Sequence, residues 1–389
     1  MSEAAVLRRT SSTYGLYLAL GCLGYMLTAL GAILPELREE RGLPRSEVAL
    51  YPSAFALGLV AVGLVGHRLA RRLGRFALPA ALVALVGGAA VIAVTGGRLG
   101  TGAGALVLGL GGAGLVQLVP AALRALHGGD GTVPIGEANA VSSTASILSP
   151  VLIGAALAQG LGWRAAFAVP PLALAAVLLL TRRAVAPVAE ADAAPAAGER
   201  TPRAFVSRWI DLVLAVGVEF CAVFWAADFL RSVKDLGSGA ATTFSAAFLV
   251  GMAAARALSG PVLRAAGGTD RLLPASAAVG AAGFAVLWAA PAPLAVAGLL
   301  VAGLGVALLY PVILGRALAA WPAQPVRAAA RCALASGVAI GVAPLVLGTL
   351  ADLTTLRAAV LVAPALLLVL LVRCGWRLRG EGQVTLPRT

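Results

Sequence analysis

Residues Asp211–Arg231, DLVLAVGVEFCAVFWAADFLR, form a mostly apolar stretch of the chain. At a rise of about 1.5 Å per residue, a helix of this length crosses a hydrocarbon layer about 30 Å thick. Glu219 lies near the middle of the stretch. A charged side chain at that depth costs about 2.5–3.5 kcal/mol on insertion scales, unless it faces a polar cavity, pairs with an opposite charge or is neutralised. The stretch therefore predicts a transmembrane helix in which Glu219 is a functional candidate.

The composition indicates that the rest of the chain also lies in a membrane. Of the 389 residues, 60% are hydrophobic and only 12% are charged, and the mean hydropathy is +0.93. A soluble globular protein has about 25% charged residues. The sequence therefore predicts an all-α polytopic membrane protein, which we expect to be integral to the cytoplasmic (inner) membrane and monomeric.

The charge and the cysteine content exclude several other classes of protein. The net charge is +13, and the arginines lie between apolar stretches instead of forming a stripe with interleaved aromatic residues. We therefore expect anionic lipid head groups, and not nucleic acid, as partners. None of the four cysteines forms a CxxC pair, and His67 and His127 lie in predicted loops. We expect neither a disulfide framework nor a metal site, and no histidine-based catalytic centre.

Apolar stretches predict twelve transmembrane helices in two pseudo-symmetric bundles of six. An Ala-, Pro- and charge-rich stretch separates the two bundles and predicts a flexible cytoplasmic linker. The predicted domains are the N-terminal bundle 1–181, the linker 182–207, and the C-terminal bundle with its tail, 208–389. The predicted spans are 14–34, 47–66, 76–95, 101–123, 136–159, 162–181, 208–231, 240–260, 272–290, 292–315, 328–350 and 355–374.

The distribution of basic residues predicts the orientation of the chain. With both termini in the cytoplasm, the inside segments carry 21 basic residues and the outside segments carry 8, while Arg256 lies within a span. Basic residues are concentrated in the cytoplasmic loops of membrane proteins. We therefore expect both termini and the linker to be cytoplasmic.

The two halves of the sequence repeat each other. A shift of 193 residues superposes Phe55 on Phe248, Gly112 on Gly305 and Gln117 on Tyr310, and a shift of 194 superposes Pro150 on Pro344. Internal repeats in a polytopic membrane protein are typical of transporters whose binding site lies between the repeats.

These features resemble the major facilitator superfamily over essentially the whole chain. The stretch His67–Arg75 resembles the basic 2–3 loop of that family, with Arg71 at its acidic position and Gly74 at its glycine. The second copy has Arg264 and Gly267 at the corresponding positions. The resemblance implies alternating access without a cofactor, with a proton gradient as the driving force, and a gating or structural role for these four residues and for Arg256.

Part of the second half resembles the fucose-permease-like branch of that superfamily. The matching residues are Val216–Glu219, Trp225 and Leu230, followed by Gly251-Met252 and Arg256. This resemblance implies a small polar, sugar-like solute.

Glu219 has two interpretations, and so do the polar and aromatic residues within other spans. Glu219 either carries a coupling proton or contacts the solute, or it pairs permanently with Arg256 and only orients helices. Hydrogen-bonding and aromatic side chains in the predicted spans either line a solute cavity or form bonds between helices. The candidates for such a cavity are Tyr25, Gln117, Trp225 and Tyr310.

Small and polar residues within two other spans favour helix packing. Asn139, Ser142, Ser146 and Ser149 share one face of a helix, where close packing explains them at least as well as solute contact. The stretch Gly109–Gly114 matches the dinucleotide motif G-x-G-x-x-G. It lies inside a membrane span and not after a soluble strand, so we interpret it as a close approach of helices.

The sequence thus predicts a secondary transporter of a small solute that works by alternating access. Proton-coupled uptake of a small polar solute is the main hypothesis, and proton-driven efflux of an amphipathic compound is the alternative. No Walker motif is present, and no cluster of nucleophile, base or metal ligands supports a membrane enzyme. A receptor that binds without translocation is a further alternative, because it would leave the same sequence pattern.

Overall fold

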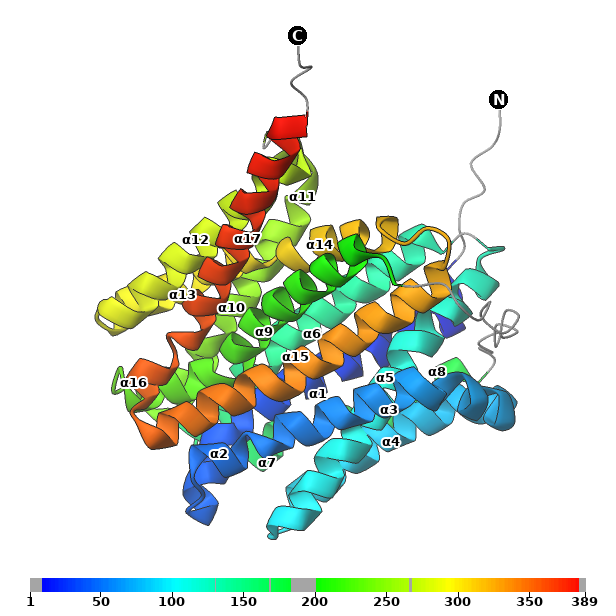
Figure 1. Ribbon diagram of the computed structural model, residues 1–389. Helices are drawn as coiled ribbons and strands as arrows, with labels where there is room; N and C mark the ends of the chain where they lie inside the picture. The colour runs from blue at the N-terminus through cyan, green and yellow to red at the C-terminus, as the bar shows by residue number, and fades with distance from the viewer. Residues whose placement is uncertain (1–8, 130, 168, 183–200, 266–267, 385–389) are drawn as a thin grey trace. The chain divides into compact units, whose positions relative to one another are not determined.

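The computed structural model describes residues 9–129, 131–167, 169–182, 201–265 and 268–384 (Figure 1). These residues form helices with short connections, and no strand occurs among them. Eleven segments of this described part are long and apolar enough to cross a membrane. The predicted all-α polytopic fold is therefore confirmed. The remaining predicted span, 162–181, is covered by two shorter helices, α7 and α8, on either side of residue 168.

The contacts between residues divide the described chain into two compact units. The first contains the described residues of 9–29, 54–149 and 161–182, and the second contains those of 30–53, 150–160 and 201–384. Two segments of the N-terminal half, 30–53 and 150–160, thus pack with the C-terminal helices. The predicted division of the chain at its centre stays a prediction. Most of the predicted linker, residues 183–200, lies outside the described residues, and α9 begins at Arg203, inside the range predicted for the linker.

The N-terminal half of the chain contains one 3₁₀ helix among its α-helices, and the short helix α2 belongs to the second unit. Helices α1 and α3 each continue from one unit into the other, and so does α6. The bounds are α1 Ser11–Arg41, α2 Arg45–Val48, α3 Leu50–Leu73, η1 Gly74–Phe76, α4 Ala77–Val94, α5 Arg98–Leu126, α6 Thr132–Ala158, α7 Trp163–Phe167 and α8 Val169–Thr181.

The described residues of the C-terminal half form helices α9 to α17. In Figure 1, α12 and α13 run side by side in yellow, with α17 in red beside α12. The bounds are α9 Arg203–Ser232, α10 Ser238–Ala257, α11 Ser259–Ala265, α12 Thr269–Ala289, α13 Ala292–Val306, α14 Leu309–Ala319, α15 Pro325–Leu353, α16 Leu356–Ala359 and α17 Val362–Val384.

Glycines allow the helices of each unit to pack backbone against backbone. A Cβ atom built on Gly109 of α5 would lie 2.1 Å from the carbonyl oxygen of Phe55 in α3. A Cβ atom on Gly303 of α13 would lie 2.0 Å from the carbonyl oxygen of Phe248 in α10. Such distances are too short for any side chain at either glycine. Small residues of this kind allow membrane helices to approach each other closely. The interpretation of Gly109–Gly114 as a packing motif is therefore confirmed.

The same contacts confirm the internal repeat and correct its register. The Cβ position of Gly111 lies 2.2 Å from the backbone nitrogen of Leu85, and that of Gly305 lies 2.1 Å from the backbone nitrogen of Gly280. Gly305 thus corresponds to Gly111 by a shift of 194, and not to Gly112 as the sequence comparison predicted. The register of the repeat therefore changes earlier in the chain than predicted. In this register Tyr310 corresponds to the residue before Gln117.

The polar face predicted on 136–159 packs against α1 within the first unit. A Cβ atom on Gly24 would lie 2.5 Å from the hydroxyl of Ser142 and 2.8 Å from that of Ser146. The hydroxyl of Thr28 donates a hydrogen bond to the carbonyl oxygen of Ser146 at 2.9 Å. The preferred interpretation of this face, close helix packing, is therefore confirmed at Ser142 and Ser146 and stays a prediction at Asn139 and Ser149.

Candidate functional site

Glu219 and Arg256 form an ion pair within the second unit. Glu219 lies in the middle of α9, and Arg256 is the last residue but one of α10. The Nη2 atom of Arg256 lies 3.7 Å from Oε1 of Glu219, and the side chains are 42% and 18% exposed, respectively. The distance exceeds that of a charge-assisted hydrogen bond, about 2.7–2.9 Å. The pair is therefore an electrostatic contact that leaves much of the guanidinium accessible.

A break between α13 and α14 supplies a second partner for Arg256. Helix α13 ends at Val306 and α14 begins at Leu309. Pro311 has no backbone N–H, so the carbonyl of Ala307, four residues earlier, lacks its usual helical donor. Nε of Arg256 donates to that carbonyl oxygen at 3.4 Å. Pro311 thus accounts for the break just before α14, and the carbonyl group that it leaves free orients Arg256.

Tyr310 lies beside the ion pair, at the start of α14. Its side chain lies near Ser336 of α15 and interacts electrostatically with Glu219, Arg256 and Cys332. The hydroxyl of Ser336 itself donates to the carbonyl oxygen of Cys332 at 3.4 Å. Four helices therefore bring a carboxylate, a guanidinium and two hydroxyl groups together in one unit. Of the four predicted cavity residues, Tyr310 is the one that the structure places with Glu219. Ser336 was missed by the sequence analysis, because nothing distinguishes an isolated serine in a small-residue helix.

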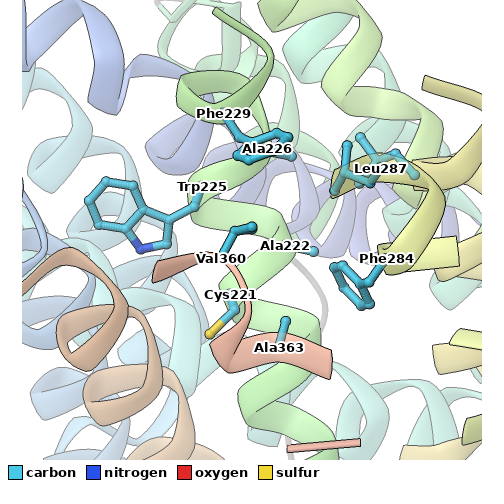
Figure 2. A pocket seen from close by; sticks show the side chains of 10 residues that line it. Cys221, Ala222, Trp225, Ala226, Phe229, Phe284, Leu287, Val360 and Ala363 are labelled. Carbon is cyan, nitrogen blue, oxygen red and sulfur yellow. The ribbon is translucent and has the colours of Figure 1, made fainter. Parts of the chain in front are cut away.

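Trp225 lies two turns further along α9, where it is fully packed. Its side chain is 1% exposed, and its Nε1–H donates to the carbonyl oxygen of Pro344 at 3.0 Å. Trp225 also lines a small pocket between α9, α12, α13 and the start of α17. Cys221, Phe229 and Phe284 line the same pocket (Figure 2). The ten lining residues are apolar apart from the Cys221 thiol, and Glu219 is not one of them. The geometry at Trp225 is that of helix packing in this conformation.

Tyr25 and Gln117, the other two predicted cavity residues, belong to the first unit. Tyr25 is 5% exposed, and its hydroxyl donates to the carbonyl oxygen of Ala166 at 2.7 Å. Gln117 is exposed, and its side-chain oxygen lies 3.0 Å from the position of a Cβ atom on Gly66. The side chain of Gln117 is thus exposed, whereas the hydroxyl of Tyr25 is already bonded. Their predicted roles in solute binding stay predictions.

The predicted gating residues lie at the ends of helices. Arg71 is exposed in the last turn of α3, and Arg264 is exposed in the last turn of α11. Gly74 has a φ of +51°, which an L side chain adopts only with strain, so a glycine is required where α3 passes into η1. Gly267 lies outside the described residues. Among the described residues, no carboxylate forms an ion pair with Arg71 or Arg264.

A second group of charged residues lies at the other end of α9. Asp228 is buried; its carboxylate accepts from Nε of Arg45 at 2.7 Å, from Nη2 of Arg38 at 3.3 Å and from the hydroxyl of Ser232 at 2.7 Å. We call these residues, together with the two neighbouring groups described next, the Asp228 cluster.

Two neighbouring groups extend the Asp228 cluster. Arg231 pairs with both Glu36 and Glu39 of α1. The carboxylate of Asp352, at the end of α15, accepts hydrogen bonds from the backbone nitrogens of Arg45 and Ser46 at 3.0 and 2.7 Å. The cluster thus joins the segment 36–46 to α9 and α15 within the second unit. Its partners lie up to 307 residues apart in the chain, so no local sequence pattern could reveal the pairing.

The charged and polar groups around Glu219 suit binding and proton transfer better than bond-making chemistry. The described residues include no group of three or more His, Cys, Asp or Glu side chains that could hold a metal ion. The carboxylate of Glu219 can exchange a proton, and the guanidinium of Arg256 can bind an anion. The two hydroxyls can donate to or accept from a polar solute.

Comparisons with known proteins agree with the fold. A family model described as Major Facilitator Superfamily matches residues 16–325. A bacterial homologue of the human lysosomal transporter Spinster, inward-facing and unoccupied, has a TM-score of 0.76 at 13% identity, covering 93% of this chain and 95% of that chain. A mutant of the nucleoside transporter NupG has a TM-score of 0.74 at 14% identity, covering 92% and 98%.

A third solved structure is also similar. The human organic anion transporter MFSD10 has a TM-score of 0.63 at 18% identity, covering 94% of this chain and 99% of that chain. At such identities the likeness shows the fold alone. A search of curated protein sequences found no significant match.

Proposed function

Because the chain belongs to the major facilitator superfamily and is a membrane transporter rather than an enzyme, we propose that it couples the uptake of a small polar solute to protons by alternating access. The observation that carries this proposal is the ion pair of Glu219 and Arg256 within the membrane-spanning helices. An ionisable residue inside a span is expensive, and in transporters such residues serve as proton relays or substrate sites.

The looseness of this pair supports a coupling role over a purely structural one. A permanent structural pair is expected to be tight and closed off, because buried charges need excellent geometry to repay their desolvation. Here the two groups are 3.7 Å apart and the arginine is 42% exposed. The carboxylate of Glu219, whose side chain is 18% exposed, is therefore not locked in a tight, closed pair.

The sugar-like class of solute stays a prediction from the resemblance to the fucose-permease-like branch. The solved structures of similar fold do not decide it, because the solutes that their descriptions name differ from one another. A polar solute is supported by the hydroxyls of Tyr310 and Ser336 beside the ion pair.

The proposed coupling can be tested in proteoliposomes that contain a trapped pH indicator. Candidate solutes are first selected by their effect on the melting temperature of the purified protein, and then applied as gradients. We expect a transported solute to move protons with it and to support counterflow. Counterflow without proton movement for every transported solute would contradict the coupling. Binding without counterflow would instead support the receptor alternative.

Tyr310→Phe and Gln117→Ala are expected to weaken solute binding by about 2- to 10-fold each. The reason is the loss of one hydrogen bond to an uncharged group, which contributes about 0.5–1.5 kcal/mol. The measurement is the dissociation constant of a solute found in the screen, with melting temperature as the check on folding. Tyr14→Phe is a suitable control, because Tyr14 is 54% exposed. Unchanged affinity in both variants would show that Tyr310 and Gln117 contribute to helix packing and not to solute binding.

We also propose that the transporter lies in the cytoplasmic membrane as a monomer, with both termini inside. Cysteines introduced at Ala194 and Ser238, on a background without the four native cysteines, test this orientation. We expect an impermeant thiol reagent to label the Ser238 position in intact cells, and the Ala194 position, outside the described residues, only after permeabilisation. Equal labelling of both positions in intact cells would refute the orientation.

A further inference from the structure

We infer that the solute is a small hydroxylated organic anion whose carboxylate binds Arg256 when Glu219 takes up a proton. This inference rests on the proposed proton coupling and names the chemical class of the solute that the same site takes.

The first argument is the charge balance of the site. Arg256 and Glu219 together carry no net charge, and Glu219 is the single carboxylate found within ion-pair distance of Arg256 in the described chain. When Glu219 takes up a proton, the charge of Arg256 loses its partner within the helix bundle. An uncompensated guanidinium inside a membrane protein is unfavourable. A bound carboxylate restores neutrality, whereas an uncharged sugar does not.

The second argument is the geometry of the guanidinium. Its Nε is directed to the Ala307 carbonyl, and its Nη2 lies 3.7 Å from Glu219 without a hydrogen bond between them. A guanidinium presents a rigid fork of donors that matches a carboxylate with two parallel hydrogen bonds. With 42% of the side chain exposed, an incoming carboxylate can reach this fork and displace Glu219.

The third argument concerns the groups that surround the pair. Among the described residues, Tyr310 of α14 interacts electrostatically with both members of the pair, and Cys332 of α15 interacts with Tyr310. Neither adds a second carboxylate, which would neutralise Arg256 in place of the solute and would repel an incoming anion. The hydroxyls of Tyr310 and Ser336 are well suited to hydroxyl groups on the solute. We therefore specify a hydroxy acid and not a purely hydrocarbon acid.

The inference has a consequence for the energetics of transport. One proton on Glu219 and one anion on Arg256 enter the site together, so the loaded transporter carries the same net charge as the empty one. The transport step is then electroneutral. Symport of one proton with an uncharged solute would instead move one positive charge per cycle and would respond to the membrane potential.

Matched pairs of acids and alcohols distinguish these cases on the purified full-length protein. The probes are lactate against propane-1,2-diol, glycerate against glycerol, and gluconate against sorbitol. We expect at least one acid to raise the melting temperature, more strongly at pH 6 than at pH 8, while its alcohol has no effect. Calorimetry of that acid in buffers of different ionisation enthalpy should show uptake of about one proton on binding, since binding is linked to the protonation of Glu219.

Variants assign these effects to the two residues. Arg256→Gln should lose acid binding, whereas Glu219→Gln should keep it but lose both the pH dependence and the proton uptake. Arg271→Gln, an exposed arginine at the start of α12, is the matched control and should behave as wild type. If Arg256→Gln alone does not fold, the double variant Glu219→Gln with Arg256→Gln is neutral at the site. It should fold without binding the acid.

Three outcomes would overturn the inference: none of the acids binds, an alcohol binds as well as its acid, or acid binding survives in the double variant. Proton uptake that accompanies binding of an alcohol would support the proposed proton coupling but would refute the inference that the solute is an anion. Acid binding without proton uptake would contradict both, because the inference requires a proton on Glu219.

Discussion

Asp228→Ala is expected to lower both the stability of the protein and its rate of solute accumulation more than any other single change in the Asp228 cluster. The substitution removes the carboxylate that lies between Arg38 and Arg45. Among the described residues, it leaves the guanidinium of Arg45 without an ion-pair partner and that of Arg38 with Glu39 alone, at 4.0 Å. Removing one partner of a buried ion pair costs about 3–5 kcal/mol. We expect a loss of about 3 kcal/mol, near the lower end, because each arginine side chain is about one-fifth exposed.

The effect on transport follows from what the cluster joins. It links the segment 36–46 to α9 and α15, so a transporter that alternates between two states is expected to break and remake these contacts in each cycle. Asp228→Ala should therefore favour the state in which the cluster is open. We would measure the melting temperature, solute accumulation, and the rate at which an impermeant reagent labels a cysteine placed at Ser232.

Asp235→Asn is the control for this experiment. Asp235 lies in the same connection after α9, is exposed, and has a φ of +55°, a conformation that asparagine also adopts readily. We expect this variant to melt and transport like wild type. A wild-type melting temperature together with wild-type accumulation in Asp228→Ala would show that the cluster contributes little to either state.

Glu219→Gln is expected to abolish accumulation driven by a pH gradient while binding and exchange of the solute continue. Glutamine has the shape of the protonated acid but cannot release a proton. The variant therefore mimics the transporter with a proton permanently bound at residue 219. Without a proton to load and release, a gradient of protons no longer drives the solute. The measurements are gradient-driven accumulation and counterflow in the same proteoliposomes.

A structural role for Glu219 predicts a different pattern. If the pair with Arg256 only holds α9 and α10 together, Glu219→Gln leaves an unpaired guanidinium and should lower the melting temperature and every transport activity together. Removing Arg256 as well should then restore stability. Full gradient-driven accumulation in Glu219→Gln would refute the coupling role outright, whatever the stability of the variant.

Much of this protein could be predicted from its sequence, because the membrane imposes a local requirement on each helix. A segment that crosses hydrocarbon must be long, apolar and helical, and each of these properties can be read within about twenty residues. The apolar stretch around Glu219 therefore identified α9, and the glycines of 109–114 identified a close helix contact. The repeat was also visible, although its register was off by one residue at Gly112, since a one-residue insertion leaves no mark in a chain rich in small residues.

The tertiary structure alone decided which side chains meet. Hydropathy does not specify the rotation of a helix about its axis, and that rotation determines whether a polar group faces a partner or the lipid. Packing placed Arg256 and Tyr310 beside Glu219, whereas it buried Trp225 of the same helix against Pro344. It also paired Asp228 with arginines 183 and 190 residues away in the chain. Such pairings depend on the free energy of the whole bundle, because each buried charge is stable only where a distant helix supplies its counter-charge.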